Sequence, residues 1–323
     1  MKIRGYFVIF IFFLASGCLT AENKTEFTAP HPVLNISIPE NISIAGEIQL
    51  INDKLEINNE TDEPVFNESL DDKDPSWSPD GNWIVFDSKR AGNRDIWLMD
   101  SKGNNLKRFT LYDSTEQSPR FSPDGKKIAF ERHGYTNGIY THGIWIMDSS
   151  GENIKEIVNC AENCMSPSWS PDGSKIAYSI RGKIWEADLN KNLRKQLTNG
   201  TAVDLYPSWS PDGKKIAFSS TESGDTEIWV MDSDGGNRKK LTTRVGLDLT
   251  PSWSPDGNWI VFSSIGDIWV MKADGTEQKA LTEWNLFVTK GNPSWSPDGS
   301  KIAFDSNKAG TRDIWILLLI KEE

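Results

Sequence analysis

The sequence predicts an all-β fold, a six-bladed β-propeller of four-stranded antiparallel blades, and three observations lead to it. The heptapeptide PSWSPDG begins at Pro75, returns unchanged four times and occurs once more as PRFSPDG. Each copy is followed by short apolar segments that include Ile-Trp, with no stretch of helical period between them. The copies recur every 40–48 residues, the length of one propeller blade.

The first element of each repeat is a turn. Serine, proline and glycine at the first, second and fourth places of SPDG suit a type I turn, because proline presets φ and glycine relaxes the exit. SPDG is therefore predicted to join the first strand to the second. The six prolines of this turn are Pro79, Pro123, Pro171, Pro211, Pro255 and Pro297.

The remaining strands follow in order. Five residues after each of these prolines stands an isoleucine, and two places later an aromatic residue, which marks the return strand. Ile-Trp opens a mostly apolar third strand, and a short fourth strand ends at Leu-Thr or a close variant. A single meander of this kind cannot bury both faces, whereas a ring of six packs each sheet between two neighbours.

The sixth unit stops after its third strand, so we expect an N-terminal strand to close the ring. In four links between blades, the last apolar residue lies ten places before the next opening proline, and ten places before Pro75 is Val65. The stretch Thr61–Asn67 is thus predicted to be the closing strand. Residues 33–58 leave two alternatives open, an extra hairpin or a degenerate seventh blade, since IPEN imitates SPDG.

These residues carry a family resemblance. The segment PSWSPDGKKIAFSS, continued by EIWVMDSDGGNRKKLT, resembles the repeat of TolB-type propellers, which also occurs in the propeller domains of prolyl oligopeptidase and tricorn peptidases. The resemblance covers roughly residues 60–320. It implies an interaction scaffold that docks proteins in the cell envelope. The chain has no room for the separate N-terminal α/β domain of TolB, so the resemblance does not carry over that protein's specific partners.

The N-terminus predicts export. MKIRGYFVIFIFFLASGC has two basic residues, an apolar run and small residues before a cysteine, as in a secretory signal peptide over residues 1–17. LASGC resembles a lipoprotein cleavage box, which makes Cys18 the expected lipid attachment site; cleavage elsewhere is the alternative. We expect residues 18–59 to be a tether, residues 60–323 the propeller, and the protein to sit at the outer surface of the cytoplasmic membrane or in the periplasm.

Apart from Cys18, the cysteines are Cys160 and Cys164 in NCAENC. In an oxidising compartment they are predicted to form a disulfide, because a metal site would need a second ligand pair nearby. Six N-x-[S/T] triplets leave open whether the chain is glycosylated.

Composition and motifs argue against several function classes. A net charge of −11 disfavours nucleic acid, which requires basic patches. No G-x-S-x-G nucleophile elbow occurs, and the repeated aspartates of SPDG suit turns better than catalytic pairs. His133 and His142 share one segment and could in principle hold a metal ion, but we interpret them as polar residues of a surface loop. No cofactor and no metal is therefore predicted.

The prediction for the binding surface rests on loop variation. Thirteen of the 14 tryptophans recur at blade positions and are read as core, which leaves Trp284 outside the repeat. The loops between second and third strands hold 9, 13, 5, 9, 5 and 9 residues, whereas the opposite face repeats SPDG six times. Specificity usually lies in varied loops on a rigid scaffold. The candidates are His133, Tyr135, Tyr140, His142, Tyr112, Tyr206, Arg244 and Trp284.

The sequence thus predicts a monomeric, non-catalytic, lipid-anchored scaffold that binds a protein partner at the cell envelope and touches the membrane only through its lipid. The alternative is a metal-dependent propeller enzyme that degrades polysaccharides, because some pectin-fragment lyases of related propeller type use a histidine-held metal.

Overall fold

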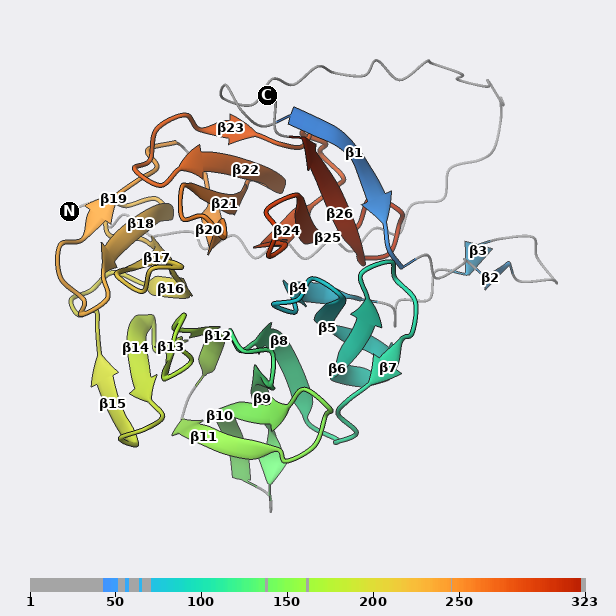
Figure 1. The fold of residues 1–323 in the computed structure, drawn as a ribbon, viewed down its shortest axis with the longest axis horizontal. Helices are drawn as coiled ribbons and strands as arrows, with labels where there is room; N and C mark the ends of the chain where they lie inside the picture. The colour runs from blue at the N-terminus through green and yellow to red at the C-terminus, as the bar shows by residue number, and fades with distance from the viewer. Residues whose placement is uncertain are drawn as a thin grey trace, which may run out of the picture. The chain divides into compact units, whose positions relative to one another are not determined.

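Six four-stranded antiparallel sheets stand in a ring, each with its first strand nearest the centre (Figure 1). The computed structural model describes residues 43–51, 56–57, 64–65, 71–136, 139–160, 163–244 and 246–320, all within one unit, Ile36–Glu323. Every regular element among them is a strand, and these residues contain no helix that could cross a membrane. The predicted six-bladed, all-β propeller is confirmed.

The first three blades follow the predicted strand order. Blade one consists of β4 (Lys73–Trp77), β5 (Trp83–Ala91), β6 (Asn93–Asp100) and β7 (Lys107–Arg108). Blade two consists of β8 (Thr115–Phe121), β9 (Lys127–Thr136), β10 (Ile139–Asp148) and β11 (Lys155–Cys160). Blade three consists of β12 (Cys164–Trp169), β13 (Lys175–Ile180), β14 (Lys183–Asp188) and β15 (Leu193–Gln196).

The other three blades repeat this order, except that the last borrows its outer strand from the N-terminal side. Blade four consists of β16 (Asp204–Trp209), β17 (Lys215–Ser220), β18 (Glu227–Asp232) and β19 (Lys239–Lys240). Blade five consists of β20 (Asp248–Trp253), β21 (Trp259–Ser264), β22 (Asp267–Lys272) and β23 (Lys279–Ala280). Blade six consists of β24 (Lys290–Trp295), β25 (Lys301–Ser306), β26 (Asp313–Ile320) and β1 (Ser43–Gln49).

The ring is closed by an N-terminal strand, but a different one from the strand predicted. β1 pairs antiparallel with β26, from Ser43 opposite Ile320 to Gln49 opposite Trp315, and the two lie side by side in Figure 1. Of the predicted stretch Thr61–Asn67, the structure describes β3 (Pro64–Val65), which pairs with β2 (Glu56–Ile57). The assignment of Thr61–Asn67 as the closing strand is therefore wrong.

The error has a physical origin. The ten-residue spacing was taken from four other links between an outer strand and the inner strand of the next blade, and it was assumed to hold for the link into blade one. The link from Gln49 to Lys73 is more than twice as long, and long surface connections cost little extra closure entropy. Because Ser43–Gln49 completes the sixth blade, the seventh-blade alternative for residues 33–58 is also wrong.

Each SPDG turn is held by the same local bonds. In blade four the Ser210 hydroxyl donates to the Asp212 carboxylate at 2.7 Å and accepts from the Lys215 amide at 2.9 Å. The Gly213 amide donates to the Ser210 carbonyl at 2.9 Å, and Gly213 has a φ of 70°. A Cβ on this glycine would also come within 3.2 Å of Pro171 in the preceding blade, so the turn requires glycine.

The apolar core lies between blades. One cluster joins Ala217 and Ile228 of blade four to Ile260 and Phe262 of blade five. The return-strand aromatics are fully buried, whereas all third-strand tryptophans except Trp315 are half-buried. The threonine of the Leu-Thr motif has a structural role: the Thr242 hydroxyl accepts from the amide of Ile228 at 2.9 Å, which ties the end of the outer strand to the third strand.

Candidate functional site

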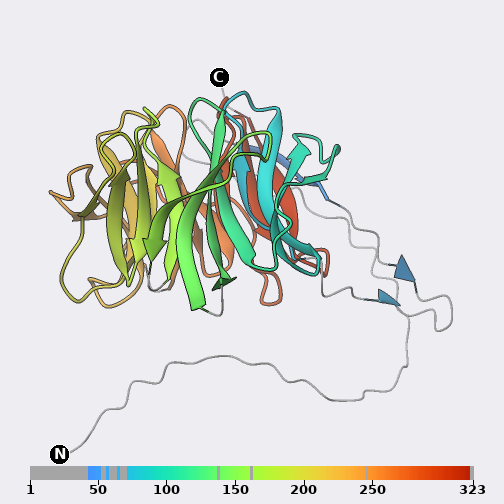
Figure 2. The same cartoon turned by 90° about the horizontal axis from the view of Figure 1, so that it is seen from below.

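The two ends of the ring differ. We call the end with the six SPDG turns the SPDG face, and the end with the loops between second and third strands and the links between blades the varied face. Figure 2 shows the blades from the side, with strands running between the two ends. The structure places the predicted partner residues on the varied face or in the cavity that opens there.

Blade two extends furthest, and four of the predicted residues meet on it. His133 and Tyr135 lie on β9, opposite His142 and Tyr140 on β10. The centre of the Tyr140 ring lies 5.0 Å from the centre of the Tyr135 ring and 5.0 Å from the centre of the His142 ring. The sequence placed the two histidines in a loop, which is wrong: both lie in regular strands, because the hairpin continues to Thr136 and resumes at Ile139.

This hairpin presents apolar and polar groups together. Tyr135 is 77% exposed and Tyr140 is 48% exposed, while both histidines are half-buried. Burial lowers the pKa of His133, with a further contribution from His142, and burial also lowers the pKa of His142. Both rings are accordingly neutral at pH 7, and the cluster is an uncharged aromatic surface suited to contact with a protein.

The other predicted residues are distributed around the ring. The Arg132 guanidinium stacks 3.9 Å from the centre of the Tyr112 ring, beside blade two. Arg244 lies on the link into blade five, 3.3 Å from the centre of the Trp269 ring. Both arginines are held by aromatic faces instead of extending freely into solvent.

Trp284 lies in an apolar turn on the link between blades five and six. Trp284, Leu286 and Phe287 are 64%, 70% and 82% exposed. Asn285 shapes the turn, since its side-chain oxygen accepts from the Phe287 amide at 2.9 Å and its carbonyl accepts from the Val288 amide at 3.2 Å. The tryptophan that the sequence singled out therefore belongs to a group of three exposed apolar side chains.

A polar funnel lies at the centre of the varied face, and Tyr206 lies in it. The residue before the opening proline of each blade has a positive φ and forms a bulge in the innermost strand; these are Asp74, Ser118, Ser166, Tyr206, Thr250 and Asn292. The funnel contains a cavity of about 510 Å³. Asp74, Asp87, Glu131 and Tyr206 are among its lining residues, so blades one, two and four contribute to one hollow.

One strand position beside this funnel carries an acid in only three of the six blades. The residue after the return-strand aromatic is an acid in blades six, one and two (Asp305, Asp87 and Glu131) and a serine in blades three, four and five (Ser179, Ser219 and Ser263). All three acids accept from the bulge amide of the next blade: Asp87 from Ser118 at 3.0 Å, Glu131 from Ser166 at 2.5 Å and Asp305 from Asp74 at 3.4 Å. The buried acids therefore join neighbouring blades.

Burial dominates the electrostatics of these acids. It raises the pKa of Asp87 well above its usual range, with Asp74 adding to the rise and the ion pair with Arg94 opposing it. Burial likewise raises the pKa of Asp305, against the effect of its Arg312 partner. Burial raises the pKa of Glu131 to about 7, against the lowering effect of the hydrogen bonds that it accepts from Gln117 and Ser166; no cationic partner opposes the rise among the contacts described.

Sequence reasoning missed these funnel residues. It compared whole loops between blades and did not compare single positions within the strands. The usable signal was the position after the return-strand aromatic, which reads D, E, S, S, S, D around the ring. Where one position differs in charge between blades while the neighbouring positions repeat, that position is not fixed by the packing between blades.

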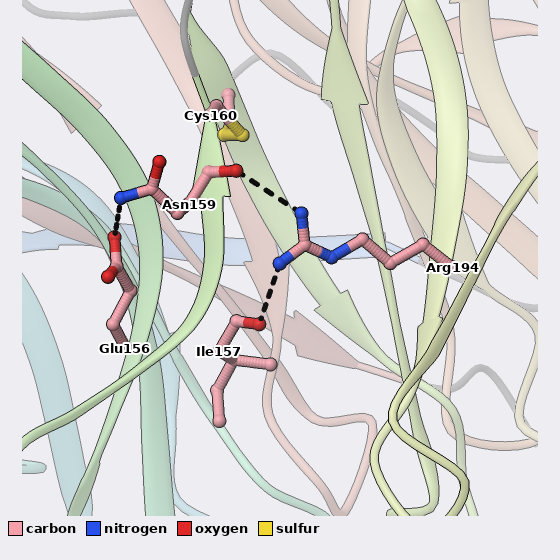
Figure 3. Close-up of a disulfide and its surroundings, with 6 residues drawn as sticks. Glu156, Ile157, Asn159, Cys160 and Arg194 are labelled. Atoms are coloured by element: carbon pink, nitrogen blue, oxygen red, sulfur yellow. Dashed lines mark hydrogen bonds between the residues drawn. A yellow bond between two sulfur atoms is a disulfide. The ribbon is translucent and has the colours of Figure 1, made fainter.

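Cys160 and Cys164 are joined by a disulfide on the link between blades two and three, with a Cα–Cα distance of 6.2 Å. Figure 3 shows this region: the Arg194 guanidinium donates to the carbonyl oxygens of Asn159 at 3.2 Å and Ile157 at 3.4 Å. The disulfide thus ends β11 where blade three contacts it. Cys18, the predicted lipid site, lies outside the described residues.

The described residues contain no group of three or more histidine, cysteine or acidic side chains placed to hold a metal ion. The funnel carboxylates are bonded to backbone amides, arginines or amides of side chains. Chemically, the varied face offers an aromatic hairpin, an apolar turn and a central polar hollow whose lining carries both acidic and basic side chains.

Comparison with known proteins assigns the family. The sequence profile of the TolB beta propeller domain matches residues 54–140 and 132–267. The Tol-Pal system protein TolB of Francisella tularensis subsp. mediasiatica is 37% identical over 70 residues, which are 22% of this chain and 14% of that protein. The chain therefore matches only a small part of the length of this curated relative.

Solved structures show the same fold. The structure of a putative TolB from Agrobacterium tumefaciens has a TM-score of 0.63 at 24% identity and covers 79% of this chain and 91% of that one. An oligogalacturonate lyase in complex with manganese has a TM-score of 0.53 at 13% identity and covers 77% and 90% of the two chains. At these identities the likeness concerns the fold alone. The profile match, which spans more than half of the sequence, shows that the chain belongs to the TolB beta propeller domain family.

Proposed function

We propose that this protein is a non-catalytic scaffold of the cell envelope that binds a protein partner through its varied face. The observation that carries the proposal is the concentration of exposed aromatic side chains on the blade-two hairpin, where Tyr135 and Tyr140 are 77% and 48% exposed. Tyrosine provides a large contact area and has few rotatable bonds that lose freedom on binding, which suits the centre of a protein interface. The relatives named for the Tol-Pal system support an envelope role.

The charge of the whole chain adds a chemical preference. Its net charge is −11, whereas the central hollow is lined by the acids Asp74, Asp87 and Glu131 and by the cations Lys73, Lys89 and Arg94. Complementary charge steers association and disfavours wrong partners. The partner should therefore present a basic or neutral surface to this face.

The position of β1 is compatible with an anchor at the opposite end. Ile44 lies opposite Leu319, whose amide donates to the carbonyl of Ser300 in an SPDG turn at 2.9 Å. The chain before Ser43 thus joins the propeller at the SPDG face. We propose that a lipid on Cys18 holds the protein at the membrane through residues 19–42 and leaves the varied face to the partner.

The experiment compares cross-linked capture from intact membranes by the full-length wild type and three variants. Tyr135→Ala combined with Tyr140→Ala should reduce capture of a specific partner by roughly tenfold or more, as expected for hot-spot loss, with an unchanged melting temperature. Lys214→Ala, an exposed change on the SPDG face, should leave capture unaltered and serves as the matched control.

A third form, Cys18→Ser, tests the anchor separately and should leave the detergent phase without altering partner affinity. Equal capture by the wild type and the double tyrosine variant, or loss of capture with Lys214→Ala alone, would move the interface off the blade-two hairpin. No observation favours the alternative of a polysaccharide-degrading enzyme.

A further inference from the structure

The apolar turn between blades five and six is part of a larger exposed apolar surface on the varied face, a feature that marks contact sites. Leu247 on the link into blade five and Ile265 between β21 and β22 are each more than half exposed. A Cβ on Gly246 would lie 2.7 Å from Cγ1 of Ile265, so these two segments touch. The Lys290 amide donates to the Gly266 carbonyl at 2.9 Å, which joins the same loop to the link that holds the turn. These contacts bring together five side chains that we call the apolar patch: Leu247, Ile265, Trp284, Leu286 and Phe287.

The local structure does not explain why residue 265 is an isoleucine. Ile265 has a φ of 49° and Gly266 a φ of 81°, so the turn between β21 and β22 has left-handed backbone at both positions. Such a turn favours asparagine, aspartate and glycine, and a β-branched residue is strained there. The side chain is also outside the core. An exposed isoleucine in this conformation therefore indicates a contact with something outside the chain.

The backbone at the tip of the apolar turn is already hydrogen-bonded within the protein. The amide of Phe287, the most exposed of the five side chains, donates to Asn285 Oδ1 at 2.9 Å, and its carbonyl accepts from Asn307 Nδ2 at 3.2 Å. Asn307 Oδ1 also accepts from the Thr289 amide at 2.7 Å, which fixes the turn to the adjacent loop of blade six. The interior of a bilayer offers no hydrogen bonds, so only backbone groups that are already bonded enter it at low cost. Both backbone groups of Phe287 meet this condition.

The charges around the patch favour an uncharged contact surface. Residues 284–288, Trp-Asn-Leu-Phe-Val, carry no charge. Lys290, on the same link, is buried, and its Nζ is paired with Asp267 at 2.8 Å and donates to the Glu283 carbonyl at 2.9 Å. An anionic surface would repel a chain with a net charge of −11. The patch therefore suits the surface of a zwitterionic bilayer.

We propose that the apolar patch rests on a lipid bilayer, with Trp284, Leu286 and Phe287 entering the boundary between headgroups and acyl chains. Tryptophan is enriched at this depth because its ring is apolar and its N–H is polar. Blade five lies across the ring from blade two (Figure 1), so a bilayer at the patch leaves the blade-two hairpin to a partner. Residues 19–42 span at most about 80 Å, which lets a lipid on Cys18 reach the same bilayer. This inference goes beyond the proposed scaffold function and does not depend on it.

The test places a polarity-sensitive fluorescent label at the tip of the turn through Leu286→Cys in the full chain, with phosphatidylcholine vesicles as the bilayer. The emission should shift to the blue when vesicles are added and should be quenched by spin-labelled lipid. Lys214→Cys, an exposed position on the SPDG face, is the matched control and should show neither change. The wild type taken through the same labelling measures the background from Cys18, since Cys160 and Cys164 are joined in a disulfide.

Two further changes in the labelled chain keep the result specific. Trp284→Ser combined with Phe287→Ser should lower the equilibrium constant for insertion at least about tenfold, because two large apolar side chains no longer leave water. Tyr135→Ala combined with Tyr140→Ala should leave the signal of the label unchanged, which separates this surface from the blade-two hairpin. Circular dichroism checks that each variant folds.

Three results would overturn the proposal. The first is a label at residue 286 that stays in a water-like environment with vesicles, as expected when the tether alone holds the chain. The second is equal insertion by the chain with serine at 284 and 287. The third is a blue shift without vesicles that grows with protein concentration, because a second copy of the chain would then cover the patch.

Discussion

The SPDG face and the varied face are built from the same 24 blade strands, yet they satisfy their polar groups in different ways. At the SPDG face each turn is self-contained: a serine, an aspartate and a glycine bond to one another within five residues, as Ser210, Asp212 and Gly213 do. At the varied face the bonds cross between blades, as from the Ser166 amide of blade three to Glu131 of blade two.

This difference explains why residues at the varied face differ between blades, whereas those of the SPDG turns repeat. A turn that closes on itself depends on its own residue types, so each blade keeps the same four letters. At the varied face an acid such as Asp87 bonds to the bulge of the next blade, whereas the buried hydroxyl of Ser179 at the same position of blade three has no hydrogen-bond partner, so this position tolerates either residue type. Evenly repeated bonds keep the ring regular at the SPDG face, while the residue type at this strand position of the varied face differs between the two halves of the ring.

The largest effect on stability is expected from removing β1, the strand that closes the ring. A chain that starts at residue 52 lacks β1 and leaves β26 with an unpaired edge, which should lower the free energy of unfolding by on the order of 5 kcal/mol and promote self-association. A chain that starts at residue 43 should keep the wild-type stability. Urea unfolding and light scattering measure both quantities; equal stability of the two chains would refute the closure by β1.

An effect of intermediate size is expected at the varied face, where the free energy of unfolding should depend on pH. The pKa of Glu131 is raised from 4.5 to about 7, so the folded protein holds this proton more tightly than the unfolded chain does. The stabilisation is fully present below pH 4.5 and is lost as the pH rises to 7, which amounts to about 1–3 kcal/mol. Glu116, whose pKa is also raised to about 7, acts in the same direction.

Glu131→Gln retains an oxygen for the Ser166 amide and removes the charge. The variant should therefore lose part of the decline in unfolding free energy between pH 5 and pH 8 and be more stable than the wild type at pH 8. Glu152→Gln, at an exposed position, is the control. Identical pH profiles of Glu131→Gln and the wild type would show that this carboxyl is not the group that titrates.

The smallest effects should come from single exposed side chains, one at each face. Asp212→Ala removes acceptors for the Ser210 hydroxyl at 2.7 Å and the Lys214 amide at 3.0 Å, which should cost about 1 kcal/mol. Leu286→Ser on the varied face, where the side chain is 70% exposed, should stay within about 0.5 kcal/mol of the wild type. If the order of these two changes were reversed in urea unfolding, the assignment of the SPDG face as the structural end would be wrong.

The sequence by itself determined the number of blades, the order of strands within each and the location of the turns. It could do so because these features depend on local chemistry: Pro211 and Gly213 dictate a turn wherever the chain places them, and Ile-Trp alternation marks a strand without reference to its neighbours. The aromatic hairpin of blade two was also within reach, since loop length is visible in the sequence.

Only the tertiary structure decided which segment closes the ring and which residues meet at its centre. The choice of Ser43–Gln49 over Thr61–Asn67 depends on pairing with β26, about 270 residues away in sequence, and no local pattern encodes that distance. The funnel joins Asp74, Glu131 and Tyr206 from three blades, and their shared hollow arises because ring closure turns every innermost strand toward one axis. Burial, which raises the pKa of Glu131, is likewise a property of the assembled ring.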